Sequence, residues 1–141
     1  MRQKGLVGVL RSIRFYAHLS RYVFVNRMYD WRHRVNTSGT IRIGDLDVSS
    51  KNWEYGCDYA PTAVESGRAI LASVEIDPSE YTFVDFGSGK GRMLFLASEL
   101  DFKEIVGVEF ARDLHALGVE PATRPGESIH LLGGVEAAQA V

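Results

Sequence analysis

Three glycines at alternating positions, Gly87, Gly89 and Gly91, separate two segments of different character. Residues 81–86 before them are β-branched and aromatic, which is typical of a buried strand. Residues 92–100 after them carry apolar side chains at helical spacing. Because glycine has no Cβ, such a turn adopts backbone angles that other residues avoid, and a ligand can lie against its amides. The chain is therefore constrained to a strand–turn–helix unit with a binding surface at the turn.

A second strand follows this helix and ends in an acid. Residues 105–108 read Ile-Val-Gly-Val, and Glu109 comes next. The order strand, glycine turn, helix, strand, acid describes one βαβ unit of a parallel, doubly wound sheet. A third strand is predicted over residues 128–132. We expect an α/β fold with a Rossmann-like sheet.

The sequence ahead of this unit predicts two more helices. Apolar residues recur at helical spacing over residues 5–29. Residues 36–52 are rich in Ser, Thr, Asn, Asp and Gly, which indicates a connector with one short strand. A helix is predicted to begin at Thr62, because Thr62 and Glu65 stand in the order of a capping box.

Charge is distributed unevenly along the chain. Residues 1–36 hold eight Lys and Arg and one acid, Asp30, a net +7, whereas residues 37–141 hold eight basic and 17 acidic residues, a net −9. The basic residues interleave with aromatic ones, as in an amphipathic helix with a solvated basic face. The same segment leaves nucleic acid or an acidic protein surface as a candidate partner. We divide the chain into a basic helical extension with its connector, 1–52, and an α/β domain, 53–141.

Length and composition exclude several classes of protein. The 141 residues suffice for one ordinary domain. No stretch approaches the ~20 apolar residues of a membrane-spanning helix, so we expect no membrane partner. A lone Cys57 and the lack of a secretory signal predict a cytoplasmic protein. The four histidines are too dispersed for a metal site, and none is expected.

Spacing separates the kinds of nucleotide site that use a glycine turn. A phosphate-binding P-loop needs Gly-x-x-x-x-Gly-Lys-Ser/Thr, but Gly91 follows Lys90 here and Val84 stands at the first glycine position. A dinucleotide fingerprint, Gly-x-Gly-x-x-Gly, places its third glycine where this chain has Arg92. The pattern that remains is acid-x-Gly-x-Gly-x-Gly, which begins at Asp85.

This pattern, with Glu109 at the next strand end, resembles motif I of class I S-adenosylmethionine-dependent methyltransferases. Residues 83–89 and 106–109 are similar to the non-SET histone-lysine methyltransferases of the disruptor-of-telomeric-silencing type and to small bacterial methyltransferases, and residues 59–62 resemble a stretch that precedes their core. The resemblance covers roughly residues 53–115. It implies S-adenosylmethionine as the cofactor and a sheet that is only the N-terminal part of the family's seven strands. The residues implied to contact the cofactor are Asp85, Gly87, Ser88, Gly89, Gly91 and Glu109, the last through the ribose hydroxyls.

Most of these residues also have a purely structural interpretation. Asp85 needs a partner beside a strand, either the cofactor ammonium, directly or through water, or local backbone amides. Glu109 is either the ribose ligand or a solvated strand end. Thr62 is interpreted as a helix cap, and Lys90 and Arg92 as solvated residues at a helix start.

The resemblance implies transfer of the sulfonium methyl group to an unidentified acceptor, a protein lysine or a small molecule. No catalytic residue is identified. Because no recognisable substrate-side motif follows Glu109, we expect either a truncated or altered product or a chain whose remaining half is contributed elsewhere, with doubtful activity alone. Two alternatives stay open: a nicotinamide-dependent oxidoreductase, and a non-catalytic fragment that binds the cofactor or nucleic acid.

Overall fold

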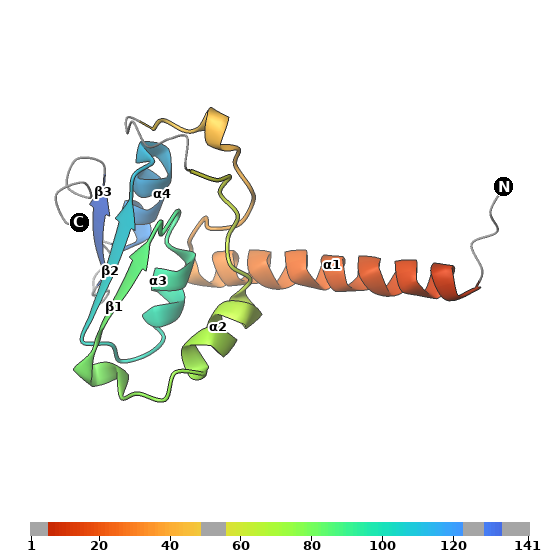
Figure 1. The fold of residues 1–141 in the computed structure, drawn as a ribbon, viewed down its shortest axis with the longest axis horizontal. Helices are drawn as coiled ribbons and strands as arrows, with labels where there is room; N and C mark the ends of the chain where they lie inside the picture. Colours follow the sequence, from red (N-terminus) through yellow and green to blue (C-terminus); the bar gives the residue numbers. More distant parts are fainter. Residues whose placement is uncertain (1–5, 49–55, 123–128, 134–141) are drawn as a thin grey trace.

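A computed structural model describes residues 6–48, 56–122 and 129–133 of the chain (Figure 1). Three parallel strands form one sheet in the order β1 (Thr82–Phe86), β2 (Glu104–Glu109) and β3 (Ile129–Gly133). In this register Asp85 pairs with Gly107, which pairs with Leu131. The predicted α/β fold with a parallel sheet is confirmed, and it is compatible with part of a Rossmann-like fold.

Two helices cover one face of the sheet. α3 (Arg92–Ala97) packs on β1 and β2, and α4 (Arg112–Ala122) packs on β2 and β3. Both helices contact the same face of the sheet. A Cβ at Gly107 of β2 would touch Leu94 of α3, and Leu131 of β3, which pairs with Gly107, lies against Gly118 of α4. Two right-handed crossovers in one direction along a sheet place their helices on a single face. The sequence did not predict α4.

β1 is an edge strand whose side chains alternate between partly buried and exposed. Phe83 and Asp85 lie on the helix-covered face, whereas Val84 and Phe86 are exposed, Phe86 to 68%. The prediction of a buried strand was therefore wrong for β1. An apolar run like that of β1 is typical of a strand whose sheet is covered by helices on both faces. In this structure the described helices cover only one face of the sheet.

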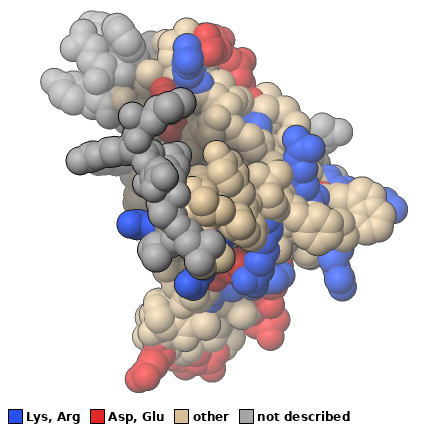
Figure 2. Space-filling model, turned by 90° about the vertical axis from the view of Figure 1, so that its right-hand side faces the viewer, with Lys and Arg blue, Asp and Glu red and all other residues tan. Residues whose placement is uncertain are grey.

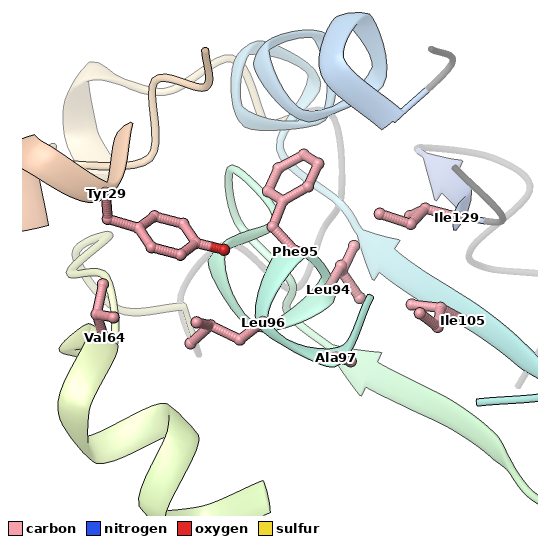
Figure 3. Close-up of a cluster of buried hydrophobic side chains, with 8 residues drawn as sticks. All are labelled: Tyr29, Val64, Leu94, Phe95, Leu96, Ala97, Ile105 and Ile129. Carbon is pink, nitrogen blue, oxygen red and sulfur yellow. The ribbon is translucent and has the colours of Figure 1, made fainter. Parts of the chain in front are cut away.

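The core lies between α3 and the elements around it. Figure 3 shows Tyr29 reaching from α1 toward α3, where residues 94–97 are buried, with Ile105 and Ile129 behind them on the sheet. α2 (Val64–Ala72) closes the other side of α3. The two helices approach closely at Gly67, where a Cβ would lie 2.5 Å from Leu96 Cδ1.

α1 (Leu6–His33) extends four residues past the predicted end, and its N-terminal part projects from the body (Figure 1). No helix in the described ranges is long and apolar enough to cross a membrane. The connector makes a short 3₁₀ turn, Ile43–Asp45, and single antiparallel bridges at Ile41 and Val48 in place of the predicted strand.

The predicted capping box of α2 was also wrong. α2 begins at Val64, and its N-cap residue Ala63 makes no side-chain capping hydrogen bond. Asn26 of α1 supplies an acceptor instead, because its Oδ1 receives the Val64 amide at 3.3 Å.

Candidate functional site

A pocket of about 320 Å³ opens where β1 and β2 end. Its walls come from the end of β1 with the glycine turn and the start of α3, from Leu46 and residues 56–62, which extend the connector, and from residues 109–114, where β2 ends and α4 begins. The carboxyl edge of a parallel sheet is where ligands bind in open α/β folds. Of the residues predicted to contact a cofactor, the pocket wall includes Asp85, Gly87, Ser88, Gly89 and Glu109, and Gly91 lies outside it.

The three glycines all have positive φ, but each position requires glycine for a different reason. Gly87 (φ 76°) faces open space, so the backbone is bare toward the pocket. Gly89 (φ 57°) lies under the Tyr59 ring, and a Cβ there would be 2.4 Å from Tyr59 Cε2. Gly91 (φ 82°) is the N-cap residue of α3 and contacts Phe95.

The amides of the turn are already used within the protein. Those of Gly87 and Ser88 donate to the Val108 carbonyl at 2.8 and 3.1 Å, and that of Gly91 donates to the Ser88 carbonyl at 2.8 Å. The Gly89 amide donates to Glu109 Oε2 at 2.7 Å. A phosphate-binding turn presents such amides to the ligand, so this turn is not built as an anion cradle.

Glu109 is an internal anchor of the site. Its side chain is 3% exposed, and its oxygens accept the amides of Gly89 at 2.7 Å and Ala111 at 2.8 Å. The alternative of a solvated strand end is therefore wrong. Carboxylate oxygens hold up to four hydrogen bonds between them, so Glu109 keeps acceptor capacity toward the pocket that it lines.

Asp85 differs from Glu109 in having no partner. It lies partly buried in the pocket wall, and no described residue donates a hydrogen bond or an ion pair to its carboxylate. Burial, and secondarily the charge of Glu109, raise the pKa of Asp85 above its ordinary value. The sequence-based alternative in which local amides satisfy Asp85 is not what the structure describes.

The Ser88 side chain points away from a ligand. Its Oγ lies 3.0 Å from where a Cβ would stand on Gly107, and it is buried with no hydrogen-bond partner among the described residues. The contribution of Ser88 to the pocket wall therefore comes from its backbone.

Arg92, expected to be solvated, is buried at the base of the pocket with 2% exposure. Its guanidinium donates to Asn26 and Thr37, to Asp30 at 3.0 Å and to Ser38 at 3.1 Å. We call these five residues the Arg92 cluster. It joins the last turns of α1 and the start of the connector to the first residue of α3. The signal that could have revealed it is Asp30, the single acid in the first 36 residues.

Lys90 is also buried, which corrects the expectation that it is solvated. Its Nζ donates to the Ser38 carbonyl at 3.2 Å and lies 5.2 Å from the centroid of the Tyr59 ring. Tyr59 in turn donates its hydroxyl to the Thr37 carbonyl at 2.6 Å, and burial raises the pKa of Tyr59. The connector is thus held over the glycine turn, with the Tyr59 ring as its contact with Gly89.

The pocket is acidic. Asp58, Asp85 and Glu109 line it. Among the described wall residues Arg92 is the one Lys or Arg, and its guanidinium is engaged by the Arg92 cluster. Across the described residues no group of His, Cys, Asp and Glu is arranged to hold a metal ion. The arrangement favours a cationic organic ligand that is wide enough to contact both the bare turn and the two strand-end acids.

No protein-family model and no curated protein matches the chain. Among solved structures, YjhP from E. coli is similar, with 24% sequence identity and a TM-score of 0.41. The similarity covers 50% of this chain and 29% of the YjhP chain.

Proposed function

We propose that the pocket binds S-adenosylmethionine and that the chain is the cofactor-binding part of a methyltransferase. The observation that carries the proposal is the Asp85 carboxylate, which lines the pocket beside the bare backbone of Gly87 and has no partner among the described residues. An unpaired, partly buried carboxylate is costly, and a bound cation removes that cost. The ligand carries two such cations, an ammonium and a sulfonium.

The described residues fit this ligand in charge and in shape. Asp85 would accept the ammonium, directly or through water, and the backbone at Gly87 and Gly89 would lie along the amino-acid part. Glu109 would use its remaining acceptor capacity for the ribose hydroxyls, as bonds to a charged acceptor are the stronger kind. When bound, the cofactor supplies an activated methyl group. The chain's own residues bind it, orient it and exclude water from it.

The acceptor belongs to the same proposal. A protein lysine or a small molecule with a nucleophilic nitrogen or oxygen would approach the methyl group from the side of the connector. Two pocket residues there, Cys57 and Asp58, are exposed. No side chain of the described residues is assigned as a general base.

The nicotinamide alternative is disfavoured by two features of the turn. A dinucleotide presents a doubly charged pyrophosphate to the glycine turn. Here Asp85 and Glu109 would repel it, and the amides of Gly87, Ser88 and Gly89 are already donated to protein acceptors.

Calorimetric titration of the full chain tests the proposal. We expect S-adenosylhomocysteine to bind and NAD not to bind. Asp85→Asn should weaken S-adenosylhomocysteine binding by about 5- to 30-fold, as expected for losing roughly 1–2 kcal/mol of a charge-assisted bond. Asp101→Asn, an exposed acid in the loop before β2, is the matched control and should leave the affinity unchanged. Tighter binding of NAD, or equal affinity in both variants, would overturn the proposal.

A further inference from the structure

The outer side of α1 carries a stripe of exposed apolar side chains, which Ser20 and Arg27 interrupt. At about 100° per residue, Val9, Ile13, Tyr16, Phe24 and Trp31 fall within ~80° of one another around the helix. All five are exposed, and Trp31 most of all, at 76%. From Val9 to Trp31 the stripe runs for about 33 Å at 1.5 Å per residue. We call these five residues the α1 stripe.

The body of the protein does not cover this stripe. The α1 residues in contact with the core and the Arg92 cluster include Asn26 and Tyr29, which lie on the opposite side of the helix. Figure 1 shows the N-terminal part of α1 extending away from the sheet and its helices. Exposed apolar patches of this length mark interaction surfaces in other proteins.

The charges beside the stripe are basic. Arg14, Arg21 and Arg32 form a row along one flank, at about 100–120° from the centre of the stripe. Arg21 is also paired with Glu65 of α2, whereas no ion pair is described for Arg14 or Arg32. α1 contains one acid, Asp30, and it is already bound to Arg92. Figure 2 looks toward the free end of α1 and shows blue side chains around tan surface, while red side chains gather mostly at the top and bottom of the body.

A second copy of the chain is a poor match for this surface. Two α1 stripes packed together would bring arginine rows side by side with no free acid to pair with them. Aliphatic side chains beside the stripe, such as Leu10 and Val23, are exposed as well. The headgroup region of a lipid bilayer accommodates such a broad apolar surface, because a helix that lies in this region buries its apolar side chains among the acyl chains.

We propose that α1 docks on an anionic lipid surface, with its stripe buried among the acyl chains and its arginines at the headgroups. The expectation of no membrane partner rested on the lack of a spanning helix, but a helix that lies in the interface needs no span. Tyr and Trp side chains favour that depth. The excess of acids in residues 37–141 is repelled by the same surface, so the body is held on the water side.

Vesicle co-sedimentation of the full chain tests this proposal. We expect binding to vesicles of phosphatidylcholine with about one-third phosphatidylserine, and little binding to phosphatidylcholine alone. Raising NaCl from about 0.1 to about 0.5 M should weaken binding, because it screens the arginines. The double variant Ile13→Glu/Phe24→Glu should lower the partition coefficient by about tenfold or more.

Ile70→Glu on α2 is the matched control, since Ile70 is an equally exposed aliphatic residue on another helix. It should bind vesicles like the wild type. Circular dichroism should show that all variants keep their helix content. The proposal is overturned if anionic vesicles do not bind, or if the stripe variant binds them as well as the control. It is also overturned if the stripe variant turns an oligomer into a monomer, or abolishes binding of a fluorescent RNA, while no form binds vesicles.

Discussion

Replacing Arg92 by Met tests whether the Arg92 cluster holds α1 onto the body. The change removes four hydrogen bonds and one ion pair from a side chain that is 2% exposed. Removing one partner of a buried ion pair costs about 3–5 kcal/mol. Asp30 keeps the amides of Thr37 and Ser38 and the Thr37 hydroxyl as donors, so we expect the lower end, about 3 kcal/mol.

A loss of about 3 kcal/mol is a large share of the 5–15 kcal/mol that stabilises a typical domain. Urea unfolding of the full chain measures it, and amide hydrogen exchange should show the last turns of α1 opening first. Arg112→Met is the control, because Arg112 also begins a helix but is exposed and has only a 3.9 Å contact with Asp47. It should change the unfolding free energy by less than about 0.5 kcal/mol. Equal effects of the two variants would refute the reasoning.

Three further predictions concern the pocket. Gly89→Val should abolish S-adenosylhomocysteine binding in calorimetry, because its Cβ would enter the space of the Tyr59 ring at a positive φ; a folded variant that binds normally would contradict this. Glu109→Gln should lower the unfolding free energy by about 1.5–3 kcal/mol, since one acceptor of the Gly89 and Ala111 amides becomes a donor; an unchanged urea midpoint would contradict it. The affinity for S-adenosylhomocysteine should fall as the pH drops through the raised pKa of Asp85, because the cation binds the ionised carboxylate, and Asp85→Asn should flatten that profile. Without ligand, the same raised pKa means that the folded chain binds more protons than the unfolded chain, so Asp85 lowers stability as the pH rises through this range.

The sequence predicts best what local chemistry determines. The glycine turn was found because positive φ at alternating positions requires residues without Cβ, and the structure gives all three glycines positive φ. β2 and β3 lie within one residue of their predicted ranges, because buried apolar runs between turn residues are a local signal.

The errors arise where distant residues decide the outcome. Arg92 is buried because Asp30, 62 residues earlier, lies beside it, and no local pattern reports such a pair. The Thr62 cap failed because Asn26 of α1 takes the first amide of α2. α4 was missed because its apolar residues are few and it depends on contact with β3. The exposure of Val84 and Phe86 in β1 depends on whether a helix covers that face of the sheet, which the local sequence does not encode.

The position of Arg92 has a thermodynamic consequence. One side chain touches both Asn26 and Asp30 of α1, while its own backbone follows Gly91 at the end of the glycine turn. An equilibrium that shifts the last turns of α1 must therefore also shift the first turn of α3. Suppose that a ligand binds more tightly when these turns are shifted than when they are not. It then changes the affinity of a second ligand that also distinguishes the two positions, and the second ligand changes the affinity of the first by the same factor. If both proposed sites bind as inferred, and binding at either one moves Arg92, this guanidinium would couple occupancy of the pocket to docking of α1.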